Sequence, residues 1–336
     1  MQDGAADDGD VEKNGQANGQ HDKAQEPRSR FSLMIEDFSF IWFTLSMNTG
    51  ILSILMHQLP YQFNGLGILS TIMFVFNLVL FSVFFIMMLL RCILYPRSLI
   101  KACASNITEL SLIGCLPIAW YTLLAQVGLT VSNASWGGEP FFIVAVVMWW
   151  IGTIVMLAVA ATVIVVFSKT DIVNANTINP AIIVPFVGTT TNALVGGEIC
   201  QYSAEVNARV AVPVIITSYI VCGIGFFVAL LIYAAYFVKL MNTGLPPPPL
   251  TPSLIMLVGP AGQTAAAVQV LGSAAQTHFG NYGKGTFLQS QAGELLATVG
   301  VLLALLFIGI GLLFAIFGVY VILETAYKRQ HKYTLI

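Results

Sequence analysis

Long uncharged apolar stretches recur along the chain and dominate its pattern. Six of them reach the length of about 20 mostly apolar residues that a helix needs to cross a bilayer. They lie at Phe38–Leu59, Leu66–Leu90, Leu110–Val131, Pro140–Ser168, Ala211–Val238 and Leu295–Leu323. Two more stretches, Ile178–Gly197 and Ser253–Ala275, are also long and uncharged but are interrupted by Pro and Gly. The pattern predicts an all-α membrane protein with about eight transmembrane helices.

Composition supports a membrane protein and argues against an enzyme. The 336 residues are 57% hydrophobic and only 9% charged, whereas soluble domains carry about 25% charged residues. There is no nucleophile elbow, zinc-protease motif, P-loop or intramembrane carboxylate pair. The five cysteines form no CxxC pair and the four histidines have no ligand spacing. We therefore expect no metal or other cofactor and no nucleic-acid partner.

The distribution of Lys and Arg predicts the orientation of the spans. If the N-terminus is cytosolic, all 14 Lys and Arg residues except Arg209 and Lys284 fall on the cytosolic side. Positive loops favour the cytosol, so both termini are expected there. The predicted organisation is a disordered cytosolic tail over residues 1–36, a transmembrane domain over 37–327 and a short cytosolic tail over 328–336.

Polar and helix-breaking residues gather in the odd-numbered spans, whereas the even-numbered spans are more uniformly apolar. Irregular backbone at membrane depth survives only inside the protein or beside a watery cavity. This alternation predicts helical hairpins repeated around a central pore. The candidate pathway residues are Asn48, Thr49 and Gly50 in the first span, Pro117 in the third, Pro185, Gly188, Thr189 and Thr190 in the fifth, and Gly259, Pro260 and Gln263 in the seventh.

These residue types favour an anion as the transported species. A Pro frees a backbone carbonyl, and the N-terminal end of each broken helix carries partial positive charge. We expect no Lys, Arg, Asp or Glu well inside any span, so binding would be weak and release fast. At any single position, however, small residues also serve helix packing. Trp149 and Trp150 are expected to pack against lipid, and His57 to lie at the membrane interface.

The order of several short motifs resembles the tellurite-resistance/dicarboxylate transporter family, which includes sulfite efflux pumps, malate permeases and slow anion channels. The matching segments are Met47–Ser53, His57–Tyr61, Leu94–Pro96, Gly114–Pro117, Pro185 with Gly196-Gly197, and Gly259–Gln263. The resemblance covers roughly residues 38–323. It implies ten helices in five hairpins, with the odd-numbered helices lining a pore in each protomer of a homotrimer. Gly259-Pro260-Ala261-Gly262-Gln263 looks closer to sulfite efflux pumps than to malate permeases.

The sequence departs from this pattern after its eighth span. The last hairpin of the ten-helix fold, which carries a pore-occluding phenylalanine in the family, has no counterpart here. Three functions therefore stay open. The first is passive efflux of sulfite or bisulfite across the plasma membrane. The second is proton-coupled transport of malate or another C4-dicarboxylate, and the third is a truncated paralogue that does not transport. The expected partners are a small inorganic or carboxylate anion and the lipid bilayer.

Overall fold

The computed structural model describes residues 29–170, 177–284 and 288–328, and within these ranges the regular structure is entirely helical. Helices long and apolar enough to cross a membrane number eight in these ranges. Their bounds are Phe40–Gln58, Leu66–Leu94, Ile107–Val131, Glu139–Lys169, Pro180–Tyr202, Ala208–Thr243, Pro248–Tyr282 and Ser290–Tyr327. All predicted spans are confirmed, and the two that are interrupted by Pro and Gly extend a few residues beyond their predicted ends.

Odd- and even-numbered spans differ in their backbone as the sequence predicts. The even-numbered spans are single helices, namely α3 (Leu66–Leu94), α7 (Glu139–Lys169), α9 (Ala208–Thr243) and α11 (Ser290–Tyr327). Each odd-numbered span changes helix type. The pieces are η1 (Phe40–Trp42) with α2 (Phe43–Gln58), α5 (Ile107–Leu112) with α6 (Cys115–Gln126) and the π-helix η2 (Val127–Val131), η3 (Pro180–Ile183) with α8 (Val184–Tyr202), and η4 (Pro248–Leu257) with α10 (Val258–Tyr282).

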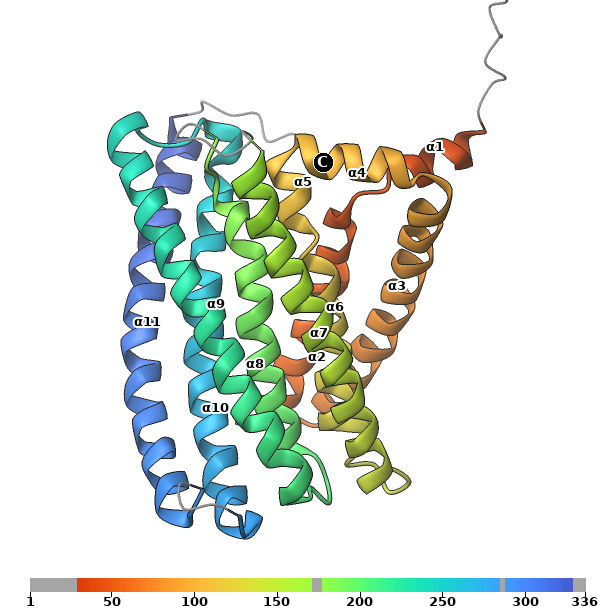
Figure 1. Cartoon of the computed structure of the whole chain (residues 1–336), viewed down its shortest axis with the longest axis vertical. Coiled ribbons are helices and arrows are strands. Elements are labelled where there is room, and N and C mark those ends of the chain that lie inside the picture. The colour runs from red at the N-terminus through yellow and green to blue at the C-terminus, as the bar shows by residue number, and fades with distance from the viewer. Residues whose placement is uncertain (1–28, 171–176, 285–287, 329–336) are drawn as a thin grey trace, which may run out of the picture.

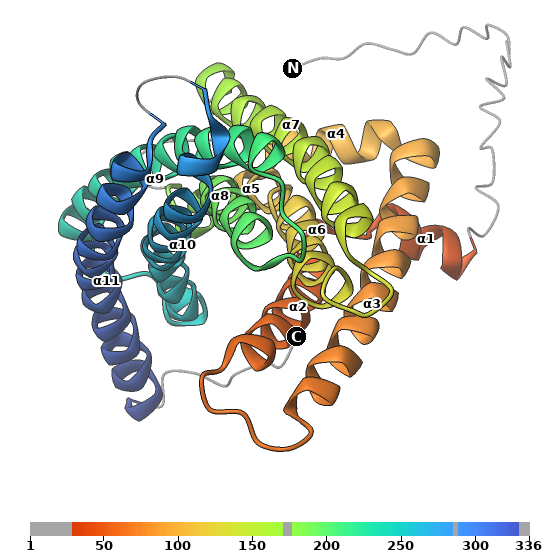
Figure 2. The same cartoon turned by 90° about the horizontal axis from the view of Figure 1, so that it is seen from below.

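The helices form two curved rows (Figures 1 and 2). Figure 2 shows α2, α6, α8 and α10 in an inner arc, with α3, α7, α9 and α11 outside it. Each inner helix packs against the outer helix that follows it in sequence, and the inner helices pack in series from α2 through α6 and α8 to α10. In the most apolar stretches of the third and fifth spans, 78% and 89% of the residues are buried, whereas the share is 17% in α3 and in α11. The outer row therefore offers its apolar surface to lipid.

The helix breaks of the inner row lie at one level. A side chain at Gly114, just before α6, would come 3.0 Å from Cα of Pro185 at the start of α8. A side chain at Gly259, at the start of α10, would come 3.3 Å from Val187 of α8. Pro117, Pro185 and Pro260 all stand in the first turn of an α-helix, where a missing N–H does little harm. The prolines and glycines thus align the breaks of neighbouring inner helices.

Buried polar side chains join the rows because hydrocarbon cannot satisfy them. Ser46 of α2 donates to Asn77 of α3 over 2.6 Å, and Asn77 donates to Thr122 of α6 over 3.1 Å. Asn192 of α8 donates to the Tyr121 hydroxyl over 3.0 Å and to Thr153 of α7 over 2.8 Å. These networks connect inner helices to outer ones, so they stabilise the scaffold.

Two expectations about individual segments need correction. Trp149 does not face lipid: it is fully buried, and its indole N–H donates to the backbone oxygen of Asn192 over 2.9 Å. Residues 30–36, predicted as part of a disordered tail, form α1 (Arg30–Glu36) at the same end as α4 (Pro96–Ser105). Ile35 is buried and Ser32 hydrogen-bonds Tyr95 over 2.5 Å, which gives this helix an anchor. Residues 1–28 and 329–336 of the predicted tails lie outside the described residues.

Candidate anion pathway

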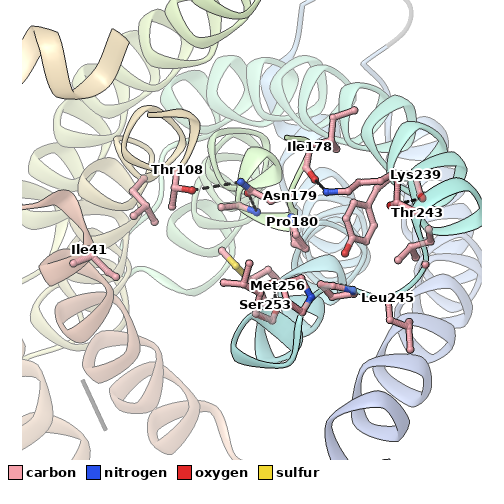
Figure 3. Close-up of a pocket in the computed structure, with 18 of the residues that line it drawn as sticks. Ile41, Thr108, Ile178, Asn179, Pro180, Lys239, Thr243, Leu245, Ser253 and Met256 are labelled. Carbon is pink, nitrogen blue, oxygen red and sulfur yellow. Dashed lines mark hydrogen bonds between the residues drawn. The ribbon is translucent and has the colours of Figure 1, made fainter. Parts of the chain in front are cut away.

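A large cavity opens at the α4 end of the bundle (Figure 3). Its volume is about 620 Å³. Residues near the starts of all four odd-numbered spans line it, together with the end of α9. Asn179 donates to Thr108 over 3.4 Å, and the Lys239 ammonium donates to the Ile178 carbonyl over 2.5 Å. The described lining of the cavity therefore combines hydroxyl and amide groups with the cationic side chain of Lys239.

Helix starts add partial positive charge around this cavity. Since all odd-numbered spans begin at the α4 end, their N–H groups point toward it. Asn179 accepts from the N–H of Ala181, and Asn106 accepts from the N–H groups of Thr108 and Glu109. Ser39 donates to both carboxylate oxygens of Glu109, over 2.8 and 3.0 Å. The capping side chains fix the spans at this end, and the helix dipoles favour an anion.

One face of α2 connects this cavity to the far end of the bundle, opposite α4. Thr44 lines the large cavity and Gln58 lines a second, smaller one of about 380 Å³. Between them, Asn48, Ile51 and Leu55 follow at helical spacing and are exposed or half-buried. Residues three and four apart share a helix face. We call these five positions the α2 stripe.

Before its exposed last residue, Tyr202, the least buried positions of α8 form a similar line. Most of the helix is buried, but Val187, Leu194 and Gln201 are half-buried and lie seven residues apart. Thr191 and Glu198 fall on the same face between them. These five residues are the α8 stripe. The α8 stripe begins at Val187, between one and two turns after Pro180 and Ala181, which line the large cavity.

The α10 helix completes the lining with a face of small and polar residues. Met256 lines the large cavity, and Gly259, Gln263, Ala266, Ser273 and Thr277 follow it at helical spacing without being buried. These six positions are the α10 stripe. Because a side chain at Gly259 would contact Val187, the α8 and α10 stripes are adjacent. The Oε1 atom of Gln263 is buried without a hydrogen-bond partner in the described chain.

The three stripes meet again at the far end. Gln58 of α2 donates to Glu198 of α8 over 3.4 Å, and Thr277 of α10 donates to Gln201 of α8 over 3.4 Å. Glu198 is only 5% exposed. The sequence predicts no charged residue well inside any span, and Glu198 lies about one turn from the end of α8, which continues to Tyr202 and encloses the carboxyl in the protein. Arg91, in the last turn of α3, is buried as well and donates to the Phe38 carbonyl.

The structure places the predicted pathway residues in three groups. Asn48, Gly259 and Gln263 lie on the stripes. Gly50, Pro117, Pro185 and Pro260 are buried among the inner helices or at their breaks, and Thr49 hydrogen-bonds its own helix at Leu45. Gly188 faces Met156 of α7, whereas Thr189 and Thr190 face Gly225 of α9. The first group is thus brought together, and the last group turns toward the outer row.

Sequence reasoning did not select Thr191 or Glu198. The run Thr189-Thr190-Thr191 offers three hydroxyls in a row, and only the rotation of α8 decides which of them shares a face with Val187 and Leu194. Glu198 was missed because the predicted span ended one residue before it. A period of seven through Val187, Leu194 and Gln201 was available as a signal, but it is weak in a helix that is buried nearly all round.

Two rows of membrane-spanning helical hairpins, with polar and small residues spaced among apolar ones along the inner row, are the architecture of a membrane transport protein. Residues 37–335 match the voltage-dependent anion channel family. The chain belongs to this family, whose members are channels and transporters.

Relatives of the chain carry transport names. The chain is 27% identical to a sulfite efflux pump of Arthroderma otae, over 85% of this chain and 74% of the relative. It is 26% identical to a sulfite efflux pump of Trichophyton rubrum with the same coverage. It is 23% identical to a putative malic acid transport protein of Schizosaccharomyces pombe, over 86% of this chain and 65% of the relative. The resemblance read from the sequence is confirmed, and the chain is an anion transporter of this family.

Proposed function

We propose that the chain releases sulfite or bisulfite from the cell along the three stripes. The observation that carries this proposal is the arrangement of the lining: Lys239 lines the large cavity, and the uncharged residues Asn48 and Gln263 follow its lining residues Thr44 and Met256 at helical spacing along α2 and α10. Uncharged donors bind a small anion weakly and release it quickly. An inside-negative potential drives each negative charge outward by about 2.3 kcal/mol per 100 mV. The names of the relatives in Arthroderma and Trichophyton support sulfite.

Malate or another C4-dicarboxylate is the alternative substrate. A protonatable group beside the pathway favours proton-coupled transport, and Glu198 provides one on the α8 stripe. The cavity of about 620 Å³ at the α4 end has the size of a pocket for a small organic molecule. The relative in Schizosaccharomyces pombe is named for malic acid.

Flux measurements in proteoliposomes separate these functions. We expect an imposed potential to drive sulfite out of the vesicles, with malate flux at the level of empty vesicles. Malate flux that depends on a proton gradient would support the alternative. Flux of neither anion from folded protein would contradict transport by this chain and favour a non-transporting paralogue.

The same assay tests the role of the large cavity. Lys239→Met should lower sulfite flux about tenfold, since about 1.4 kcal/mol of lost attraction gives that factor. Lys239→Arg should retain most of the flux because it keeps the charge. Lys169→Met removes a cation from the exposed end of α7, away from the cavity lining, and serves as the control. Equal losses in Lys239→Met and Lys169→Met would contradict a role for the cavity.

We further propose that the chain is a homotrimer in the plasma membrane with both termini in the cytosol. The bias of Lys and Arg toward the α4 end supports this orientation, and the exposed apolar surface of the outer row leaves room for neighbouring protomers. An impermeant maleimide should label the exposed Cys92, near the α4 end, only after permeabilisation. Labelling of Cys92 in intact cells would show the opposite orientation.

The oligomeric state is tested by the mass of the purified protein. The mass should equal that of three chains, and the mass of a single chain would contradict the trimer.

A further inference from the structure

Glu198 is a buried acidic residue at the far end of the proposed pathway. Its carboxyl group, when ionised, cannot serve to attract an anion. Its side chain is 5% exposed, and its hydrogen bond is a long one of 3.4 Å from the amide of Gln58. An ionised carboxylate buried with so little compensation is costly. In an anion transporter, it also repels the cargo. Burial of the carboxylate and repulsion of the anion are both unfavourable, so we expect Glu198 to have a function in transport.

The contact of Glu198 spans the mouth of the pathway. Gln58 belongs to α2 and Glu198 to α8, and α6 packs between these two helices. On the other side of the α8 stripe, Gln201 accepts from Thr277 of α10. Beyond Gln58 lies the smaller cavity, which His57, Leu129, Asn133 and Tyr202 also line. An anion that leaves the stripes for this cavity therefore passes the Glu198 carboxyl.

We propose that Glu198 and Gln58 form an outer gate in which the ionised carboxylate slows anion passage and the protonated carboxyl permits it. This inference rests on the proposed anion transport. In the protonated state, the carboxyl O–H can donate to a passing anion or to the Gln58 amide oxygen, so the same residue changes from a repelling group to a hydrogen-bond donor. A buried position in low dielectric enlarges the difference between the two states.

Other titratable and charged groups around this end belong to the spans and to the loops that join them. They are His57 on α2, Tyr61 after it, Glu139 on α7, Tyr202 on α8 itself, Glu205 in the loop after α8, Arg209 on α9, His278 and Tyr282 on α10, Lys284 after α10, and Glu294 on α11. His278 is held by the Cys200 carbonyl over 2.8 Å, and Glu205 accepts from the N–H of Glu139. Within the described residues, η2 adds no titratable group. Of the carboxyl groups named, Glu198 lies on the stripes.

Flux of nitrate tests the gate, since nitrate does not titrate near neutral pH as bisulfite does. In the wild type, flux should fall as the pH on the far side rises, because the carboxyl ionises. Glu198→Gln should remove this dependence and raise flux at alkaline pH about tenfold. Glu198→Asp should keep the pH dependence. Glu294→Gln, which removes one exposed charge from the start of α11 at the same end, should behave like the wild type.

A second readout does not need transport. Leu55 lies one turn before Gln58 on the α2 stripe, and Leu55→Cys introduces a reporter thiol there, with Cys92 and Cys103 replaced by Ser. A negatively charged methanethiosulfonate should modify this thiol about tenfold faster when Glu198→Gln is added, and a positively charged one should not. If the wild type carries no sulfite but this charge effect is seen, the proposed sulfite efflux fails, whereas control of anion access by the Glu198 carboxyl stands. An unchanged ratio of the two rates, or a pH dependence retained in Glu198→Gln, would overturn the gate.

Discussion

Gly300→Ala is expected to destabilise the protein by about 2 kcal/mol, a typical cost of inserting a methyl group where there is no room. Gly300 lies where α11 crosses α10, and an added Cβ would come 2.5 Å from the backbone oxygen of Val268. Gly293, two turns earlier, is equally close to the backbone oxygen of Ala275, at 2.6 Å. Backbone cannot move aside as a flexible side chain can, so the two helices would have to separate.

Gly309→Ala on the same helix provides the matched control. Nothing lies within 4 Å of a Cβ added at Gly309, and Ala is favoured over Gly in a helix by about 0.5–1 kcal/mol. The two substitutions should therefore shift thermal unfolding in detergent in opposite directions. Equal shifts would mean that α10 and α11 do not pack through these glycines.

Trp149→Ala is expected to lower the unfolding free energy by about 4 kcal/mol, which is more than the loss expected for Gly300→Ala. Trp149 is fully buried between α7 and α8, where Gly196 leaves room for its indole ring. Truncation empties this space and breaks the hydrogen bond to the Asn192 backbone oxygen. Trp149→Phe, which keeps most of the volume, should cost less and would isolate the hydrogen bond at about 1 kcal/mol.

The neighbouring Trp150 gives an internal comparison. Its side chain is 37% exposed, so Trp150→Ala should lose less than half as much unfolding free energy. Chemical denaturation of both variants in the same detergent measures the difference. If Trp150→Ala proved as damaging as Trp149→Ala, the rotation of α7 would have to differ from the one described here.

The sequence by itself determined the spans and the division between the two rows. A stretch such as Leu66–Leu90 must cross the membrane because its length and lack of charge leave no soluble alternative. Pro117, Pro185 and Pro260 mark the inner helices, because a broken backbone has to be kept from lipid. Neither conclusion depends on how the helices rotate about their axes.

Tertiary structure alone decided which side chains reach the pathway. Trp149 and Trp150 are chemically identical neighbours, yet one is fully buried and the other is 37% exposed. Thr190 faces α9, while Thr191 shares a face with Val187 and Leu194. In an apolar helix the hydrophobic pattern hardly fixes rotation, so close packing against neighbours sets it. The continuation of α8 past Gly197 by a single turn likewise converted Glu198 from an expected loop residue into a buried acid beside the pathway.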